Sequence, residues 1–243
     1  VTGLTTELMQ GNSAAETMTG FDFDNTWTTT SEYPALRALS ETDKGSGGGG
    51  GGDDPIQVDV NPSDLPGDGS ESTPYEISNV SELQAMEDDL DANYELVSDI
   101  DASQTAQFND GAGFDPIGSE NTPFIGSLDG NSRTVTALTI NRSTEENVGL
   151  FGVCVGELTE VTLMNATVTG NEAVGRLVGS VSGDSLLQEI RVSGKVSGDK
   201  DVGGIVGVAT GSSTLRNVTA SGEVKGTQDQ NVGGLVGFND GTI

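Results

Sequence analysis

The sequence has no histidine and a single cysteine, Cys154, among its 243 residues. The absence of histidine removes the side chain most often used for general acid–base catalysis near neutral pH, and a lone cysteine cannot form an internal disulfide. Cys154 lies in the apolar run VCV, so we expect a small core residue rather than a reactive thiol. No hydrophobic run is long enough to span a membrane, and Val1 opens no signal-peptide pattern.

Basic residues are also scarce: 10 Lys and Arg stand against 38 Asp and Glu, which gives a formal net charge of −28. Nucleic acid is therefore disfavoured as a partner, because phosphate contacts need clustered basic side chains. Such a charge repels itself in dilute buffer and is tolerated where concentrated salt screens it. The composition is similar to that of haloarchaeal proteins, and the alternative is an acidic secreted protein from a mesophile.

Aromatic residues make up 5% of the chain. Apart from phenylalanines, they are Trp27, Tyr33, Tyr75 and Tyr94, and none recurs at a regular step. This scarcity weighs against a platform on which sugar rings stack.

A repeated motif dominates the second half of the chain. The segments VGLFG, AVGRLVG, VGGIVG and VGGLVG end at Gly152, Gly179, Gly207 and Gly237, and the differences between these numbers give steps of 27, 28 and 30 residues. A period in this range indicates a solenoid, in which each unit buries its apolar side against its neighbours.

The composition of the repeats favours strands over helices, because Val, Thr, Gly and Ser replace the usual helix formers. Apolar residues alternate with polar ones in two successive copies, with Ile190, Val192, Gly194 and Val196, then Val218, Ala220, Gly222 and Val224, facing inward. We therefore predict an all-β fold, a right-handed parallel β-helix. The spacing from Gly152 to Val168 is one residue shorter than in the later copies, which predicts a bulge or a shortened corner near Met164.

Three segments are expected along the chain. Residues 1–39 have the composition of a tail that closes another unit, 40–72 form a linker rich in Gly, Asp and Pro, and 73–243 form the β-helix. A short helix near 81–91 is predicted by the capping box Ser81–Gln84 and by apolar residues at helical spacing. We expect this helix to cover the first coil of the solenoid.

A series of landmarks makes residues 73–243 similar to GLUG-motif repeat proteins: TPYEI, SELQAM, YELVSDIDAS, PFIGSLDGN, TVTALTI and VGLFG, followed by VGGIVG and VGGLVG. The chain departs from the motif at 148–150, where one glycine is missing, and at Arg176, which replaces a glycine. The resemblance implies a β-helical protein of the cell surface or extracellular space, often adhesin-like, and the head, residues 1–39, resembles the tail that closes such a domain. The resemblance also implies that the partners are tandem units or other copies of the same protein. We expect such units to be joined in one longer chain or stacked end to end in a filament.

No catalytic, cofactor or metal site is predicted. The carboxylates that polysaccharide hydrolysis could use are Asp99, Asp101, Asp115 and Asp129, and the candidate base for a lyase is Arg133. Asp99 and Asp101 are better explained as part of a strand corner. Calcium ligands are conceivable at Asp53, Asp54, Asp59, Asp64 and Asp68, but their spacing fits no EF-hand and indicates a solvated linker.

Four N-glycosylation sequons begin at Asn79, Asn141, Asn165 and Asn217, a number that chance alone explains. We interpret the chain as a structural β-helix module, a spacer, adhesin or filament segment, at the surface of a salt-adapted organism. The alternatives are a polysaccharide-active β-helix enzyme and an adhesin that binds surface glycans or another partner.

Overall fold

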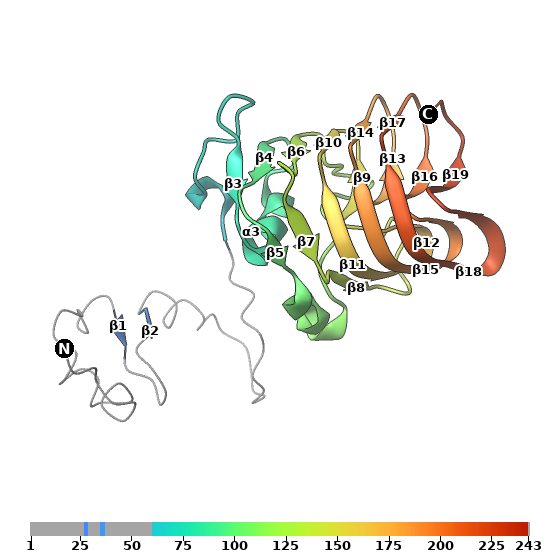
Figure 1. The fold of residues 1–243 in the computed structure, drawn as a ribbon, viewed down its shortest axis with the longest axis horizontal. Coiled ribbons are helices and arrows are strands. Elements are labelled where there is room, and N and C mark those ends of the chain that lie inside the picture. Colours follow the sequence, from blue (N-terminus) through green and yellow to red (C-terminus); the bar gives the residue numbers. More distant parts are fainter. Residues whose placement is uncertain (1–26, 29–34, 37–59, 243) are drawn as a thin grey trace. The chain divides into compact units, whose positions relative to one another are not determined.

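The computed structural model describes residues 27–28, 35–36 and 60–242 (Figure 1). The chain divides into two compact units, Val1–Asp53 and Asp54–Ile243. In the first unit, β1 (Trp27–Thr28) pairs antiparallel with β2 (Ala35–Leu36). The remainder of the predicted tail, and the predicted linker as far as residue 59, lie outside the described residues.

The second unit contains three sheets. The six-strand sheet comprises, in spatial order, β17 (Thr214–Arg216), β14 (Leu186–Gln188), β10 (Glu157–Thr159), β6 (Ser127–Asp129), β4 (Asn93–Leu96) and β3 (Tyr75–Ile77). The four-strand sheet comprises β19 (Val236–Asn239), β16 (Val206–Ala209), β13 (Val178–Val181) and β9 (Phe151–Cys154). The seven-strand sheet contains β5 (Ile100–Asp101), β7 (Thr134–Thr136), β8 (Thr139–Asn141), β11 (Thr162–Thr169), β12 (Glu172–Gly175), β15 (Arg191–Gly203) and β18 (Thr219–Gly233).

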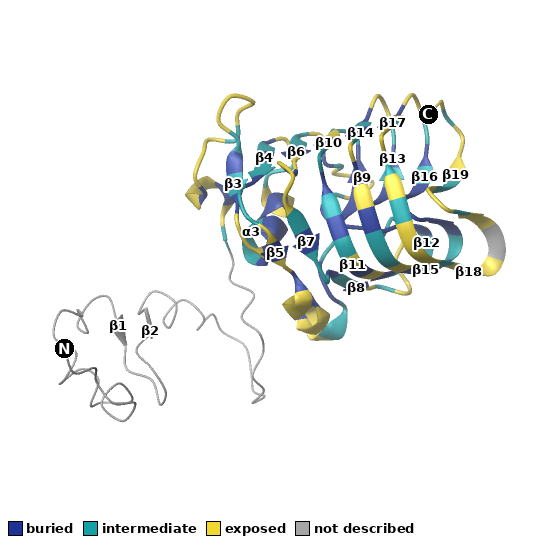
Figure 2. Ribbon diagram, in the orientation of Figure 1, coloured by how far each residue is buried: buried dark blue, intermediate teal, exposed yellow. Residues whose placement is uncertain are grey.

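Within these three sheets the paired strands run parallel, and each strand pairs with its counterparts in the preceding and following coils. The register places like residues above one another: Leu158 lies between Leu128 and Leu187, and all three are buried. Figure 2 shows buried segments recurring along the strands of successive coils. The predicted parallel β-helix is therefore confirmed.

The predicted phase of the strands and the predicted bulge are also confirmed. Val196 pairs with Val224, while Lys195 pairs with Glu223 on the outer face. In the first copy the pairing of β11 with β15 shifts register between Leu163 and Ala166, at the position of Met164.

Replacing Val196 by aspartate is expected to cost about 3 kcal/mol or more of unfolding free energy, because it places an unpaired charge in the core. Val196 is 1% exposed. Val224, which lies in the last described coil, is only partly buried, so Val224→Asp should cost about 1 kcal/mol. Lys195→Asp on the outer face is the control for the change of charge. Urea unfolding checks the order, and equal losses at positions 195 and 196 would contradict the phase.

The glycine that ends each repeat is required by a close backbone approach. A Cβ on Gly207 would lie 2.3 Å from the carbonyl carbon of Ala173 and from the amide nitrogen of Val174. A Cβ on Gly179 would lie 2.3 Å from the carbonyl carbon of Asn147. The corner of the preceding coil thus crosses directly over these glycines, which explains why the repeat ends in glycine.

A helical segment covers the first coil. It consists of α3 (Val80–Ala85) and the 3-10 turn η3 (Met86–Asp88), so the predicted helix is confirmed but ends earlier than residue 91. The predicted capping box at Ser81 is wrong. Asn79 is the N-cap, and its side chain accepts hydrogen bonds from the N–H groups of Ser81 and Glu82.

Residues 60–72, which composition assigns to the linker, pack against the β-helix where the structure describes them. Leu65, after the 3-10 turn η2 (Pro62–Asp64), is buried in the core, and the N–H of Glu76 donates to the carbonyl of Pro66. Leu65 is the apolar residue that holds this segment on the β-helix. The many Pro, Asp and Gly residues around it led the composition to predict a linker. Two further 3-10 turns, η4 (Ser103–Gln107) and η5 (Asn109–Gly111), form the corner that follows β5.

Candidate functional site

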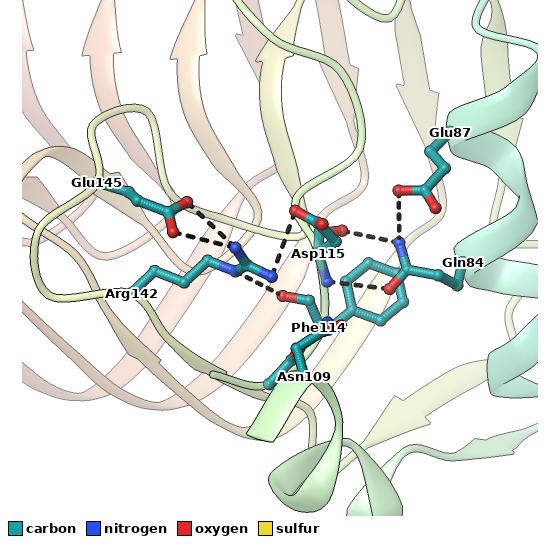
Figure 3. Close-up of polar contacts among 8 residues, drawn as sticks. Gln84, Glu87, Asn109, Phe114, Asp115, Arg142 and Glu145 are labelled. Carbon is teal, nitrogen blue, oxygen red and sulfur yellow. Dashed lines mark hydrogen bonds and ion pairs between the residues drawn. The ribbon is translucent and has the colours of Figure 1, made fainter. Parts of the chain in front are cut away.

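A group of interacting polar side chains joins the helical cap to two corners of the β-helix (Figure 3). Its centre is Gln84 of α3, which is 3% exposed. The Gln84 Nε2 donates to the carbonyl of Asp115 at 3.0 Å, and the Asp115 N–H donates to Gln84 Oε1 at 2.9 Å. This pair of hydrogen bonds fixes the cap on the corner that precedes β6.

Glu87 of η3 lies beside this amide and accepts a hydrogen bond from Gln84 Nε2 at 3.1 Å. Burial raises the pKa of Glu87 to about 7, and the negative charges of Asp115 and Asp88 act in the same direction. The hydrogen bond from Gln84 and the positive charge of Arg142 oppose this shift of the pKa.

Arg142 connects the next corner to the same group, and its side chain is 10% exposed. Its Nη1 donates to both carboxylate oxygens of Glu145, at 3.1 and 3.2 Å, and Nη2 lies 3.4 Å from Asp115 Oδ1. Its Nε donates to the carbonyl of Phe114 at 3.2 Å. The guanidinium is thus held by two half-exposed carboxylates and one backbone carbonyl, as a charge-assisted clamp between corners.

Replacing Glu87 by glutamine is expected to remove a pH dependence of stability. The pKa of Glu87 is raised in the folded chain from an ordinary value of 4.5 to about 7. Its contribution to stability is therefore fully present below about pH 4.5 and is lost as the pH rises through 7. Because Glu87 is exposed on one side, we expect about 1 kcal/mol rather than the full value of the shift.

Urea unfolding at pH 5 and pH 8 measures this effect as the difference between the wild-type chain and Glu87→Gln. The control variant is Glu157→Gln, on the exposed side of β10. Parallel pH profiles of the wild-type chain and Glu87→Gln would contradict the assignment.

The surface is hollowed next to this group, along the outer face of β9 and β13. One hollow of about 340 Å³ and an adjoining one of about 150 Å³ share Glu120, Glu146 and Asn147 as lining residues. We call them together the acidic groove. Its other lining residues are Asp115, Pro116, Gly118, Ser119, Pro123, Glu145, Val153, Val155, Ser180 and Ser182.

The acidic groove lacks the arrangement that hydrolysis of a glycosidic bond requires, a protonated acid facing a second carboxylate. Asp115 and Glu145 are held by Arg142. Glu87, whose pKa is raised, does not line the groove. Asp115 and Glu145 therefore serve to hold two corners together through Arg142, and their geometry is not that of groups that transfer a proton.

The carboxylates singled out from the sequence do not converge. Asp99 Oδ1 accepts from the N–H of Thr134, and Asp101 and Asp129 each accept from an N–H two residues ahead. The pKa of Asp101 is lowered by its hydrogen bonds with Ser103. Asp101 and Asp129 therefore fasten turns, Asp99 joins its own coil to the start of β7 in the next coil, and Asp115 belongs to the clamp of Arg142. Arg133 is exposed in a turn closed by its own N–H, which donates to the Gly130 carbonyl.

The predicted calcium ligands are only partly described. Asp64 is exposed in η2, and Asp68 accepts from the N–H of Ser70. Asp53, Asp54 and Asp59 lie outside the described residues. Within residues 60–242 no group of three or more acidic, histidine or cysteine side chains is placed to hold a metal ion.

The four sequon asparagines, Asn79, Asn141, Asn165 and Asn217, are all exposed. Asn165 and Asn217 have φ values of 57° and 53°. Asn165 lies at the bulge inside β11, and Asn217 lies in the corner between β17 and β18. Asn79 already serves as the N-cap of α3. Whether the four carry glycans stays a prediction.

The aromatic residues of the first coils are buried, whereas Phe238 in β19 is 38% exposed. Tyr75, Tyr94, Phe124 and Phe151 form a tilted stack inside the first coils, with ring centroids 4.9–6.4 Å apart. Tyr33 lies outside the described residues. Cys154 is buried, as predicted, and burial raises the pKa of its thiol to about 12.

Sequence analysis missed the most unusual buried side chain, Arg176, although its departure from the glycine pattern marked the position. Its guanidinium is fully buried and donates to three carbonyls: Nη1 to Gly204 at 2.9 Å, and Nη2 to Gly194 and Glu223 at 2.9 and 2.6 Å. Its Nε has no hydrogen-bond partner among the described residues. Burial lowers the pKa of the Arg176 guanidinium. Arg176 thus binds its own coil to the backbones of the next two.

Comparison with known proteins agrees with the repeat pattern. The GLUG motif family matches residues 198–225, so the resemblance to GLUG-motif proteins is confirmed in this coil. No helix within residues 60–242 is both long and apolar enough to cross a membrane.

Two curated proteins are similar to parts of the chain. Halomucin of Haloquadratum walsbyi is 43% identical over 127 residues, which cover 48% of this chain and 1% of halomucin. A proposed Gly-rich membrane protein of Evansella cellulosilytica is 34% identical over 126 residues, which cover 49% of this chain and 14% of that protein. The chain therefore spans only a small part of the length of these relatives.

A solved structure shares the fold. It is the crystal structure of a proposed immunoglobulin A1 protease from Bacteroides ovatus, with a TM-score of 0.51 over 72% of this chain and 64% of that chain. At 21% sequence identity, this likeness concerns the fold alone.

Proposed function

We propose that this chain, similar in part to halomucin and to a proposed Gly-rich membrane protein, is a structural module of the surface or extracellular layer of a salt-adapted cell. These similarities support the location, and the net charge of −28 supports the salt adaptation. In this role the β-helix acts as a stiff spacer or adhesive segment, and the module needs no catalytic site.

The proposal rests on the contacts that the carboxylates discussed above make. They fasten turns or pair with Arg142, while the interior is filled with stacked apolar side chains. Such a wall resists bending because each coil is hydrogen-bonded to its neighbours along three sheets.

The proposal is tested on intact cells of a host that carries the gene. Deletion of residues 60–242 is compared with the double variant Glu120→Gln and Glu146→Gln, which changes the acidic groove alone. A membrane-impermeant protease should release the module from unbroken cells. Deletion should alter cell–cell aggregation, whereas the double variant should behave as the wild type. If the double variant reproduced the deletion, groove chemistry would replace the structural role.

The acidic groove supports a second candidate, an adhesin that binds polysaccharide. Carboxylates, Asn147, Ser180 and Ser182 offer hydrogen-bond acceptors and donors to sugar hydroxyls. The test is incubation of the chain with neutral and acidic polysaccharides in 2 M NaCl, with Asp115→Asn as comparison. Retention of the polysaccharide that depends on Asp115 would favour this candidate.

The exposed sequons are also proposed as glycosylation sites for a surface protein. Mass spectrometry of the chain purified from a glycosylating host measures the occupancy of Asn79, Asn141, Asn165 and Asn217. Asn79→Gln should in addition destabilise α3 by about 1 kcal/mol, because it removes the N-cap.

A further inference from the structure

The outer faces of two sheets of the β-helix differ in the side chains that they carry. In the six-strand sheet, buried residues alternate along β3, β4, β6 and β10 with outward residues that include the carboxylates Glu76, Glu95, Asp129 and Glu157. In the seven-strand sheet, the outward residues of β7, β8, β11 and the 191–197 segment of β15 include no Asp or Glu. We call these faces the carboxylate wall and the basic wall, and Figure 1 shows their strands in successive coils.

The carboxylate wall contains a column of like charges. Glu76 is in register with Glu95, and Glu95 is in register with Asp129. Neighbouring strands lie about 4.8 Å apart, and like charges directly opposite each other destabilise a sheet. None of these three side chains forms an ion pair within residues 60–242. A cationic surface laid over the column would therefore relieve a repulsion that these coils leave uncompensated.

The basic wall presents two cations among hydroxyl groups. Arg191 and Lys195 are exposed on the outer face of β15, and neither belongs to an ion pair in the part of the chain that the structure describes. Carboxylates return at the borders of this wall, with Asp101 in β5 and Glu223 in β18. Most of its other outward residues are Thr and Ser, among them Thr134, Thr162, Thr167, Thr169, Ser193 and Ser197.

The lack of carboxylates on the basic wall contrasts with the 38 Asp and Glu residues of the whole chain. Protein interfaces are depleted in Asp and Glu and enriched in Arg relative to the rest of the surface, so this composition indicates a covered face. Its hydroxyls also meet one another across coils, since Oγ1 of Thr169 lies 3.2 Å from Oγ of Ser197. Arg191 and Lys195 are the charged groups left to meet a partner, and complementarity requires that partner to be anionic.

A second copy of the chain offers a matching surface. The two walls belong to different sheets and both face away from the interior, so the walls of a single copy cannot contact each other. Between two copies they meet with the same spacing, because both are built from coils stacked about 4.8 Å apart. The stacked carboxylates of one copy can then lie against Arg191 and Lys195 of the other.

We infer that the basic wall of one copy packs against the carboxylate wall of a second copy, so that neighbouring β-helices associate side by side. The two surfaces differ, so each bound copy keeps one free wall, and further copies can add in a row. This contact goes beyond the proposed structural role of a single module. It leaves the acidic groove open and does not depend on whether that groove binds polysaccharide.

The contact is small, and salt decides when it forms. From strand rise and strand spacing the basic wall measures roughly 20 Å on each side, an area at the low end for protein interfaces, so a single pair binds weakly. In dilute buffer the net charge of −28 on each copy opposes their approach. At 1 M salt the screening length is about 3 Å, which removes this long-range repulsion but acts less on partly buried charges in direct contact.

Sedimentation equilibrium at pH 7 in 1 M NaCl, with the 243-residue chain at up to about 1 mM, measures the self-association. Lys195→Glu disrupts the basic wall, and Glu95→Lys disrupts the carboxylate wall. Two controls make the same changes of charge elsewhere: Lys44→Glu in the first compact unit and Glu120→Lys in the acidic groove. Urea unfolding checks that all four variants keep the stability of the wild-type chain.

The wild-type chain should associate, and each wall variant should raise the dissociation constant at least about tenfold, whereas both controls should behave as the wild type. Glu95→Lys is the sharper test. It lowers the net negative charge, so it would promote association if general repulsion alone mattered. A mixture of the Lys195→Glu and Glu95→Lys chains should form dimers that do not grow, because the mixture retains one intact wall of each kind.

A wild-type chain that stays monomeric at this concentration would overturn the inference. So would an effect of Lys195→Glu without an effect of Glu95→Lys, because the basic wall would then meet another anionic surface. Loss of association by Glu120→Lys would identify that surface as the acidic groove.

Discussion

Gly207→Ala is expected to destabilise the 243-residue chain severely. The added Cβ would lie 2.3 Å from two backbone atoms, the carbonyl carbon of Ala173 and the amide nitrogen of Val174, and 2.7 Å from the carbonyl oxygen of Gly179. Backbone atoms at this corner cannot move away without breaking the parallel pairing of β12 with β15. We expect a loss of about 4 kcal/mol or more, a large part of the stability of an ordinary domain.

Gly234→Ala in the same chain is the matched control, since it makes the same chemical change at a repeat glycine with no atom within 4 Å of the new Cβ. Far-UV circular dichroism with urea unfolding in 2 M NaCl measures both variants. A Gly207→Ala chain within 1 kcal/mol of wild type would mean that the corner does not cross this glycine as closely as the structure places it.

The fold could be predicted because its causes are local and repeated. Alternation of apolar and polar residues fixed the phase of Val196 and Val224. Because the same alternation recurs in successive copies of the repeat, the inward-facing positions of one copy agree with those of the next.

The bulge at Met164 was predicted at the right place but from the wrong cause, because β11 has one extra residue there. The shorter spacing of the first copy arises instead in the corner between Cys154 and Glu157, which is two residues shorter than the corner between Val181 and Leu186.

The ends of the solenoid were less predictable, because they depend on contacts that do not repeat. Ser81 and Asn79 are both good N-caps, and Asn79 was selected because Val80 is then buried at the first helical position. Leu65 lies in a stretch whose composition is that of a linker, yet its burial extends the compact unit toward the N-terminus.

The polar group at the cap could not be assembled from the sequence at all. Gln84 and Asp115 are 31 residues apart and share no motif, and their hydrogen bonds depend on how the cap docks on the corner. Arg176 was visible as a departure from the repeat, but its three carbonyl acceptors come from two later coils. Its effect on stability depends on their geometry rather than on the residue type.

The largest effect of solution conditions is expected from salt. The chain carries 38 carboxylates and 10 basic groups, so most of its charges have no opposite charge to pair with. In 0.1 M salt the screening length is about 10 Å, and many exposed carboxylates repel one another in the compact state; at 1 M it is about 3 Å. Screening should therefore stabilise the folded chain more than the expanded unfolded chain.

We expect the melting temperature to rise by roughly 10–20 °C between 0.1 M and 2 M NaCl, which corresponds to about 5 kcal/mol for a domain of this size. At pH 4, where ordinary carboxyl groups are partly protonated, the same change of salt should have a smaller effect. This pH comparison separates charge screening from the general effect of salt on apolar burial.

The central claim, a structural module adapted to concentrated salt, is tested most directly by thermal unfolding of the 243-residue chain at pH 7 across this range of NaCl. A melting temperature that rises steadily toward molar salt, and less steeply at pH 4, is the predicted result. A melting temperature that is flat between 0.1 M and 2 M would contradict the claim.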